Sequence, residues 1–427
     1  MERPMSLPCK KPISRALVNF PENLITGNRG EFAMFSGYVN VTVEDYLFYW
    51  LVEAERNIWH DAPLIIWSNG GPGCSSMEGA TLETGPYIMF DLKQSHQMFT
   101  RRLSRNTYSW NRFAHVLYVD QPRYVGYSCG TGPYVSSSAE AGKDMVQFLL
   151  GWRQLFPEHA ARDIILASES YGGHYVPAWT EAILDYNAHS ADPIRLKGVS
   201  IGNGFISDKI QGADSFIKYQ RLQRLIPEET DPKSKSDARL LMMESMGYAP
   251  NVYDYRIKDE DCCGCTSYNY KAWGDWLMME SVIEALNVCG NAGVKAFAAC
   301  NAGCIDMPGF DKKDTFDYSG ALGRALEAGI PVTLYYGMQD TASDYIGGFL
   351  VASQLRWPGE KAFAEAPLKD LKLSDTAVGK VKMAAGLSFI QVDAAGHMVT
   401  VDNPPAASFA ISTLFNWGVS DPTSLYT

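Results

Sequence analysis

The chain has 427 residues, of which 46% are hydrophobic and 20% charged, and its formal net charge is −11 at pH 7. This composition is typical of a globular protein and argues against disorder over most of the chain. Because an acidic surface repels phosphate backbones, we expect no nucleic-acid partner. No apolar run approaches the roughly 20 residues that a membrane-spanning helix needs, so we expect no membrane span.

The first half of the chain alternates between predicted strands and predicted helices. Aromatic and β-branched residues at 32–52 predict paired strands. Short apolar runs that end in turns predict buried strands, and apolar residues recurring on one face predict helices. The predicted strands are 63–67, 116–119, 164–167 and 196–201, and the predicted helices are 138–156 and 173–186.

The alternation stops between about residues 207 and 312, where charged runs, clustered cysteines and a helical stretch near 276–286 indicate an insertion. It resumes with strands at 331–336 and 387–392 and helices at 341–355 and 404–417. This order predicts an α/β fold, with a mostly parallel sheet and helices on both of its faces. We therefore predict a core built from residues 1–206 and 313–427, with an inserted cap at 207–312.

Nine cysteines are present, and six of them lie within 43 residues in the predicted cap: Cys262, Cys263, Cys265, Cys289, Cys300 and Cys304. Such a cluster indicates disulfides in an oxidising compartment or a metal site in a reducing one. The cap has no histidine and no set of C-x-x-C pairs, which favours disulfides. Asn40-Val41-Thr42 is a glycosylation sequon. Residues 1–12 lack the apolar stretch of a signal peptide. The cysteine cluster and the sequon nevertheless favour the secretory pathway, so we expect a lysosomal, vacuolar or secreted protein numbered after, or without, its signal.

Three residues with catalytic potential follow predicted strands. Ser170 lies in Ser-Glu-Ser-Tyr-Gly between a strand and a helix, the pattern of a nucleophile elbow, although Ser168 replaces the usual glycine. Asp340 and His397 each come just after a later strand. Taken singly, Ser170 and Asp340 are better explained as helix caps and His397 as a structural residue. Together they follow the chain order of an α/β-hydrolase triad, in which His takes the serine proton and Asp orients the His.

Longer motifs make the prediction more specific. The chain contains WSNGGPGCSSMEGATLETGP at residues 67–86, and also FYWLVEAE, YSWNRFAHVLYVDQP, SESYGGHYVPA and AGHMVTVDNP. Along the chain these motifs occur in the order typical of the serine carboxypeptidase family, and they resemble that family over roughly residues 32–205 and 331–415. The resemblance implies an α/β-hydrolase fold that removes C-terminal residues from peptides and proteins through an acyl-enzyme, with no metal or organic cofactor.

The resemblance also implies roles for individual residues. It assigns a catalytic triad, two oxyanion-hole amides and a set that binds the substrate's terminal carboxylate: respectively Ser170, Asp340 and His397; Gly71 and Tyr171; and Trp67, Asn69, Glu83 and Glu169. It further implies that Cys74 pairs with one of Cys289, Cys300 or Cys304. Two glutamates beside a substrate carboxylate would bring three like charges together, unless a shared proton lets one glutamate donate a hydrogen bond. We therefore expect substrate binding to weaken as the pH rises towards neutral.

The chain departs from the family pattern near the predicted site. Met338 stands where the family has an acidic residue, Ser343 where it has a cysteine, and Thr400 where proline is common. The pair Arg123-Tyr124 replaces a smaller pair that contains glycine. These differences put the shape of the pocket in doubt more than the triad.

Three alternative functions stay open. Acyltransferases built on the same scaffold tend to alter the positions of Asn69 and Glu169, which this chain retains. A non-catalytic protective or structural protein is disfavoured by the intact triad, and a cytosolic hydrolase would keep its cysteines reduced. Glu83 could instead be a solvated helix residue, but the resemblance disfavours that interpretation. His174 is better explained as a structural helix residue than as a ligand. The sequence leaves the leaving-residue preference and the oligomeric state open, a homodimer included.

Overall fold

A computed structural model describes residues 14–26, 30–55, 58–90, 99–258, 271–289, 299–300, 310, 314 and 317–415. The chain divides into two compact units. Unit 1 comprises Met1–Ser168, Ala178–Lys197 and Tyr270–Thr315, and unit 2 comprises Glu169–Pro177, Gly198–Asn269 and Phe316–Thr427. The sequence predicted a different division, into a core of residues 1–206 and 313–427 and an inserted cap of residues 207–312. That division remains a prediction.

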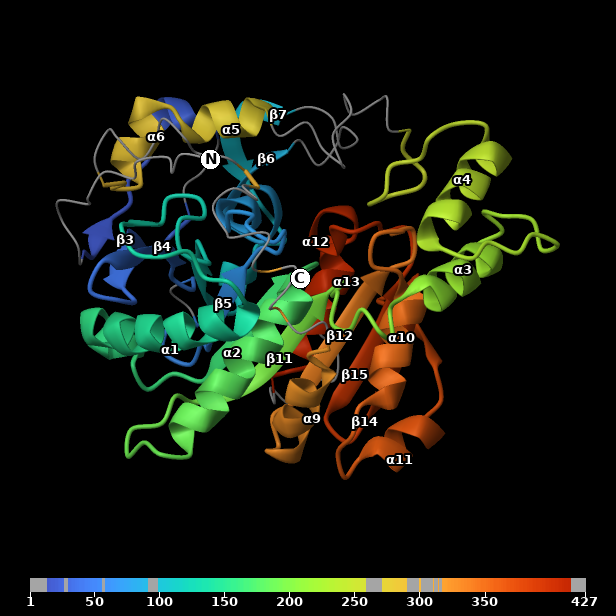
Figure 1. Ribbon diagram of the computed structural model, residues 1–427. Helices are drawn as coiled ribbons and strands as arrows, with labels where there is room; N and C mark the ends of the chain where they lie inside the picture. Colours follow the sequence, from blue (N-terminus) through green and yellow to red (C-terminus); the bar gives the residue numbers. More distant parts are fainter. Residues whose placement is uncertain are drawn as a thin grey trace. The chain divides into compact units, whose positions relative to one another are not determined.

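Unit 1 contains one large set of paired strands, in the order β1-β3-β4-β8-β5-β10. Figure 1 labels β3, β4 and β5 of this set. These strands are β1 (Ala16–Leu17), β3 (Met34–Asn40), β4 (Asp45–Val52), β5 (Leu64–Ser68), β8 (His115–Val119) and β10 (Ile164–Glu169), and β9 (Cys129–Gly130) pairs with β4. The pairs from β1 to β8 are antiparallel, and β8, β5 and β10 are parallel. Every residue of β5, β8 and β10 is buried, as expected for parallel strands covered on both faces.

The remaining elements of unit 1 are a small sheet and several helices. The small sheet has the order β2 (Ile25–Thr26), β7 (Phe99–Arg105), β6 (Tyr87–Phe90). The helices are α1 (Ser138–Leu155), α5 (Lys271–Leu277), α6 (Glu280–Ala285) and the single turns η1 (Glu22–Leu24), η2 (Gly79–Glu83), η3 (Trp110–Arg112) and η4 (Pro157–His159). The helix predicted near 276–286 is therefore wrong in extent: it is two helices, because the chain is extended at Met279.

Unit 2 holds the strands that carry the second half of the predicted triad. Its strand order is β11 (Leu196–Gly202), β12 (Val332–Gly337), β15 (Leu387–Val392), β14 (Thr376–Ala384), β13 (Lys369–Leu373). The first three are parallel, whereas β14 and β13 form an antiparallel hairpin that the sequence did not predict. Charged side chains such as Lys369 and Asp370 mask the strand pattern there, as is common for edge strands.

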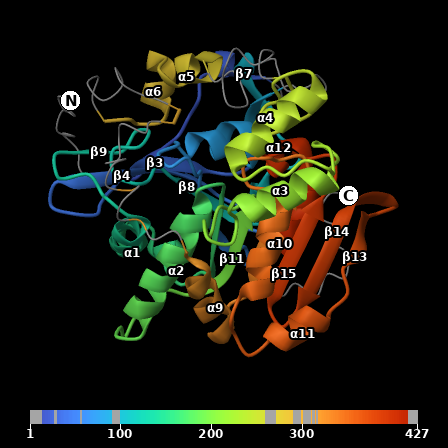
Figure 2. The same ribbon diagram turned by 45° about the vertical axis from the view of Figure 1, so that its right-hand side comes forward.

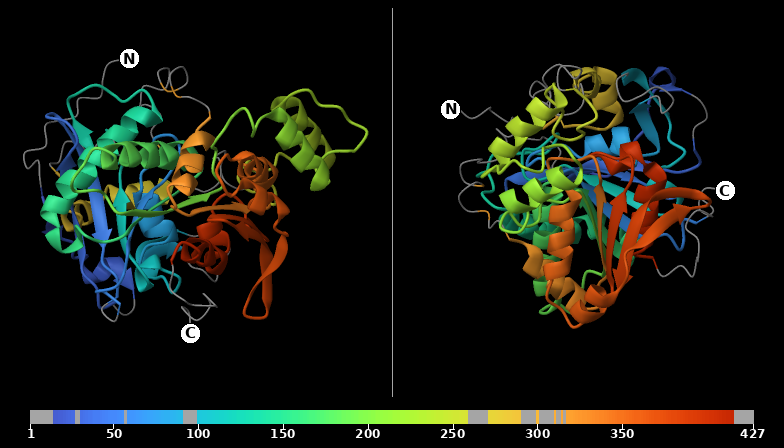
Figure 3. Two further views of the ribbon diagram at one scale, coloured as in Figure 1. Left: turned by 90° about the horizontal axis from the view of Figure 1, so that it is seen from below. Right: turned by 90° about the vertical axis from the view of Figure 1, so that its right-hand side faces the viewer.

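Helices cover both faces of the unit 2 strands. The helices are α3 (Ala213–Leu222), α4 (Lys235–Met246), α9 (Ser319–Glu327), α10 (Tyr345–Gln354), α11 (Glu360–Glu365), α12 (Val399–Asp402) and α13 (Pro404–Ser412), and α2 (Gly172–Asn187) begins in this unit. Contacts join β12 to α9, α10 and α13, and Figure 3 shows α9 and α10 on one face and α13 on the other. Figure 2 shows α3 beside α10, which it contacts.

Two helix limits differ from those predicted in unit 2. The helix predicted from residue 341 begins at Tyr345, because the side chain of Asp344 caps it by accepting a hydrogen bond from the amide of Gly347. The last helix ends at Ser412, before the predicted limit. Among the described residues, no helix is both long enough and apolar enough to cross a membrane.

Candidate active site

Ser170 occupies the sharp turn between β10 and α2, as predicted. Its φ is 58°, a left-handed conformation that a non-glycine residue rarely adopts. The turn is pinned on both sides: the amide of Ser170 donates to the carbonyl of Gly202 (3.0 Å), and its carbonyl accepts from the amide of Phe205 (2.8 Å). A Cβ at Gly173 would lie 2.4 Å from the carbonyl oxygen of Phe205, so the helix can begin this close only with glycine. This is the backbone of a nucleophile elbow.

Asp340 and His397 meet directly. Asp340 follows β12 and His397 follows β15, two adjacent parallel strands whose carboxyl ends lie at one edge. The Nδ1 atom of His397 lies 2.6 Å from Oδ2 of Asp340, and both side chains are buried. A carboxylate acceptor fixes the proton on Nδ1 and so leaves the lone pair on Nε2.

The Nε2 atom of His397 is buried and has no hydrogen-bond partner in the described part of the chain, Ser170 included. The structure therefore brings two members of the predicted triad into contact and places the third in the same unit, without the serine–histidine hydrogen bond. Such bonds are often long before substrate binds. An unpaired lone pair on a buried imidazole is the acceptor that a serine hydroxyl would need.

Asn203 supports the acid, and the sequence did not identify it. Its Nδ2 donates to Oδ2 of Asp340 (2.7 Å), and its Oδ1 accepts from the amide of Gly337 (3.0 Å). The amides of Ala342 and Ser343 also donate to the Asp340 carboxylate, at 2.7 and 3.3 Å. The sequence signal that could have identified Asn203 is Gly202-Asn203-Gly204 at the end of a strand. Asn is one of the few non-glycine residues that tolerate a left-handed backbone, and the φ of Asn203 is 41°.

The glycine-rich loop of unit 1 carries the predicted oxyanion residue Gly71. Its φ is 114°, and a Cβ there would lie 2.6 Å from the amide nitrogen of Gly73 and 2.7 Å from that of Cys74. Only glycine can occupy this position, because any side chain would collide with backbone. The second predicted oxyanion residue, Tyr171, follows Ser170 in unit 2.

A buried carboxylate holds the same glycine-rich loop in place. Asp120 accepts hydrogen bonds from the hydroxyl of Ser75 (2.7 Å) and from the amides of Ser76 and Tyr127 (both 2.8 Å). Burial raises the pKa of Asp120 to about 6, against the opposing effect of these hydrogen bonds. Asp120 therefore couples the loop after β5 to the loop after β8.

Three of the residues predicted to bind a carboxylate form one hydrogen-bonded chain in unit 1. The indole of Trp67 donates to Oδ1 of Asn69 (2.8 Å), and Nδ2 of Asn69 donates to Oε1 of Glu83 (2.8 Å). Glu83 is only 4% exposed, so its interpretation as a solvated helix residue is wrong. Glu169, the fourth residue, is buried beside Ser170 in unit 2. The binding roles of all four remain predictions.

Arg123 and Tyr124, which replace a smaller pair in the family pattern, both make buried or half-buried polar contacts. The guanidinium of Arg123 pairs with both oxygens of Asp144 (2.6 and 2.7 Å) and with Asp45 (3.1 Å). The hydroxyl of Tyr124 lies 2.7 Å from Oδ1 of Asp45 and 2.6 Å from the carbonyl of Gly132. These side chains tie the β3–β4 turn and the loop before α1 together.

The cysteine predictions are tested in part. Cys74 is bonded to Cys300, one of the three partners that the resemblance implied. Cys289 is also disulfide-bonded, and Cys129 is a free cysteine whose thiol pKa burial raises to about 12. The others, Cys9, Cys262, Cys263, Cys265 and Cys304, lie outside the described residues.

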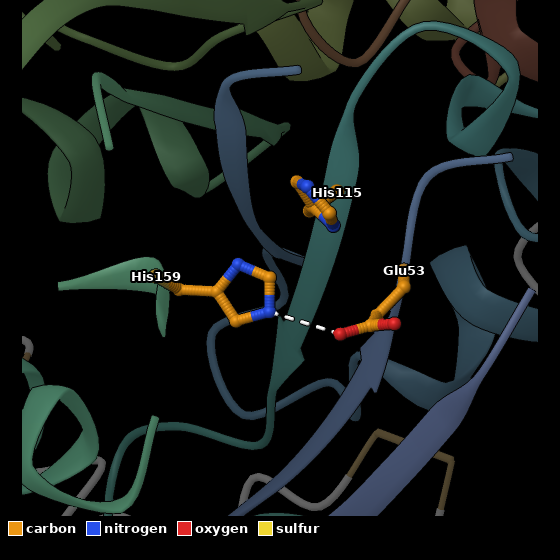
Figure 4. A group of neighbouring side chains, drawn as sticks. All are labelled: Glu53, His115 and His159. Atoms are coloured by element: carbon orange, nitrogen blue, oxygen red, sulfur yellow. Dashed lines mark hydrogen bonds and ion pairs between the residues drawn. The ribbon is translucent and has the colours of Figure 1, made fainter. Parts of the chain in front are cut away.

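One buried cluster has the side chains of a metal site: Glu53, His115 and His159, which Figure 4 shows facing one another. No sequence pattern indicated that these histidines have partners. The Nδ1 atom of His159 accepts from Arg162 (2.8 Å), so its Nε2 donates to Glu53 (3.0 Å). His115 accepts from the amide of Ala54 through Nδ1 (3.1 Å) and faces the carbonyl of residue 59 through Nε2 (3.1 Å).

Both imidazoles therefore spend their lone pairs on hydrogen bonds, and the donor set does not fit a metal ion. Burial, followed by the neighbouring His159 and Arg162, lowers the pKa of His115 to about 3, so the His115 ring is neutral. The second group of suitable side chains contains Cys74 and Cys300, whose sulfurs are joined to each other. In each group, therefore, two of the three ligands that a metal ion would need are already engaged.

Comparisons with known proteins agree with this geometry. Residues 21–240 and 233–417 match the family described as serine carboxypeptidase. Proteins named carboxypeptidase Y homolog A from Trichophyton verrucosum and Podospora anserina are each 33% identical over 411 residues, covering 87% of this chain and 72% and 70% of theirs. The solved structure of Kex1Δp, a prohormone-processing carboxypeptidase from Saccharomyces cerevisiae, has a TM-score of 0.75 at 24% identity, over 93% of this chain and 95% of that one. The predicted α/β-hydrolase fold is confirmed.

Proposed function

This chain belongs to the serine carboxypeptidase family, and we propose that it releases C-terminal residues with Ser170 as nucleophile, His397 as general base and Asp340 as the carboxylate that orients His397. The observation that carries the assignment is the buried Asp340–His397 pair in the same unit as the strained turn at Ser170. Its first test is labelling by a fluorophosphonate probe. Labelling of the native protein that disappears in Ser170→Ala supports the assignment, and equal labelling of both proteins contradicts it.

The proposed reaction uses the proton positions that the hydrogen bonds indicate. His397 Nε2 takes the proton of Ser170 as its oxygen attacks the scissile carbonyl, and Asp340 stabilises the resulting imidazolium. The imidazolium then gives its proton to the leaving amine, which frees the last residue and leaves an acyl-enzyme. A water molecule, deprotonated by His397, hydrolyses the ester. We assign the amides of Gly71 and Tyr171 to the oxyanion that forms in both steps.

We further propose that Trp67, Asn69, Glu83 and Glu169 bind the free carboxylate of the substrate. The family motifs and the hydrogen bonds of Asn69 to Trp67 and Glu83 support this assignment. Glu83, Glu169 and the substrate carboxylate cannot all stay ionised when they lie close together, so one of the three must hold a proton when substrate is bound. KM for an N-blocked dipeptide should then rise between pH 4.5 and pH 7.5. A KM that stays flat over this range rules out the shared proton.

An acyltransferase on the same scaffold is the competing activity. Retention of Asn69 and Glu169 favours hydrolysis. Incubation with an N-blocked dipeptide and, separately, with a glucose ester and an acceptor alcohol distinguishes the two. Release of the terminal amino acid supports the peptidase, whereas ester transfer without peptide hydrolysis supports the acyltransferase.

We also propose that the protein passes through the secretory pathway to a lysosome, a vacuole or the outside of the cell. The Cys74–Cys300 disulfide supports this, since such bonds persist in oxidising compartments. The sequon residue Asn40 is exposed at the end of β3, where a glycan could be attached. Treatment of the protein purified from its source with an N-glycosidase should lower its mass, and the loss should be absent in Asn40→Gln. An unchanged mass contradicts glycosylation at this site.

A further inference from the structure

His397 and Asp340 stand on two separate loops, and a third segment contacts both. We call residues 251–257 the bracket loop. The loop is closed on itself by the bridge between Pro250 and Lys258 and by a hydrogen bond from the amide of Asn251 to the carbonyl of Ile257 (2.8 Å). The Oδ1 atom of Asn251 also accepts from the amide of Tyr253 (2.8 Å). Its conformation is thus set by its own contacts, so it can act as a template for its neighbours.

On one side the bracket loop is bonded to the loop of Asp340. The amide of Tyr255 donates to the carbonyl of Gln339 (3.2 Å), immediately before the acid. Immediately after it, Thr341 donates to the carbonyl of Val252 through both its amide (3.0 Å) and its hydroxyl (2.6 Å). Both chain neighbours of Asp340 are therefore fixed to the bracket loop.

On the other side the bracket loop is bonded to the loop of His397. The amide of His397 donates to the carbonyl of Tyr253 (2.8 Å). The ring of Tyr253 also packs against the imidazole, with 4.4 Å between the ring centroids and 43° between the planes. The backbone amide and the ring of His397 thus both contact Tyr253.

A chain of charges joins the bracket loop to the residue before His397. The guanidinium of Arg256 binds Asp254, with Nε 2.8 Å from Oδ1, and its Nη2 lies 3.8 Å from Oδ2 of Asp402. The same Oδ2 of Asp402 accepts from the amide of Gly396 (2.6 Å). The side chains of Asp254 and Asp402 are 4% and 2% exposed, so each needs a nearby cation. Arg256 provides it for both.

Resting on the function proposed above for the triad, we propose that Arg256 and Asp402 form a positioning pair that holds His397 against Asp340. Neither residue belongs to the triad. The pair acts through the amide of Gly396 and the carbonyl of Tyr253, so that loss of the cation frees the His397 loop to move relative to Asp340. A displacement of about 1 Å at a catalytic group can reduce a rate about a hundredfold.

The test compares Arg256→Gln with a matched control, Arg356→Gln. The control removes the same charge from an arginine that is 83% exposed and pairs with Glu360 across one helical turn (3.2 Å). We expect Arg256→Gln to lower kcat about tenfold to a hundredfold with KM changed less than about twofold, and the control to leave both unchanged. Arg256→Lys, which restores a cation, should recover part of kcat. Asp402→Asn keeps an acceptor for Gly396 and should lower kcat in the same way.

A second readout does not depend on catalysis. The proton between Nδ1 of His397 and Asp340 should give a low-field proton NMR resonance, which Arg256→Gln should broaden or remove while Arg356→Gln keeps it. The proposal is contradicted if Arg256→Gln retains this resonance and full kcat, or if only KM changes. If the native protein shows the resonance but is neither labelled by a fluorophosphonate nor active on peptides, the proposed function fails, and the resonance in the variants still decides the positioning role.

Discussion

Asp344 offers a quantitative test of the electrostatics beside the proposed triad. Its carboxylate caps α10 through the amide of Gly347 (2.8 Å) and is buried. Burial and, secondarily, the charge of Asp340 raise its pKa from 3.8 to about 6, although the Gly347 amide and Lys235 oppose the shift. Asn at this position would keep the cap and remove the charge, because Asn and Asp are equally good capping residues.

The sign of the effect follows from the raised pKa. Between pH 3.8 and about 6 the folded state binds a proton that the unfolded state has lost, so the native protein loses stability as the pH rises through this range. The difference between the two pKa values corresponds to about 3 kcal/mol. Asp344→Asn should therefore be about 3 kcal/mol more stable than the native protein above pH 6, and equally stable below pH 3.8.

Differential scanning calorimetry at several pH values between 3.5 and 7.5 measures this difference. For a chain of 427 residues that unfolds in one step, the advantage corresponds to about 3 °C in Tm at the upper end of the range. The control is Asp375→Asn, which removes an exposed carboxylate from the turn between β13 and β14 and should leave Tm nearly unchanged. A Tm difference for Asp344→Asn that is independent of pH, or a lower Tm at pH 7.5, would refute the reasoning.

Two further perturbations test the site and the buried histidine cluster. Asn203→Gly keeps the left-handed backbone but removes the charge-assisted hydrogen bond to Asp340, so the unfolding free energy should fall by about 2 kcal/mol in a denaturation assay. In kinetic assays kcat should fall by a larger factor than KM changes. An unchanged kcat would show that Asp340 needs no such support. Because the ring nitrogens of His115 and His159 are spent on hydrogen bonds, dialysis against EDTA should leave Tm and activity unchanged. A drop in Tm that added Zn²⁺ reverses would contradict that conclusion.

The sequence predicted where the proposed site residues lie when they follow a strand or belong to one contiguous motif. Ser170, Asp340 and His397 each follow a buried strand, and chain order alone suggested their roles, since parallel strands bring their carboxyl ends to one edge. Trp67, Asn69 and Glu83 lie within one motif, and the structure links them by hydrogen bonds. Local patterns of this kind can be recognised in the sequence without any knowledge of distant contacts.

What the sequence did not reveal depends on partners far along the chain. Asn203 meets Asp340 across 137 residues, and His159 meets Glu53 across 106, so no local pattern marks either pair. The bracket loop falls in a region that looked like an insertion with no catalytic connection. The helix limit at Tyr345 was missed because Asp344, rather than Asp340, supplies the cap. Charge along β13 hid a strand pattern that tertiary pairing stabilises.

The central claim is that one serine, activated by His397 and Asp340, shortens peptides from their carboxyl ends. Mass spectrometry of a defined peptide pool, incubated with the native protein or with Ser170→Ala, tests it most directly. We predict loss of single residues from the C-termini with every N-terminus intact, and no change with the variant. Internal cleavage, trimming from the N-termini, or equal trimming by Ser170→Ala would contradict the account.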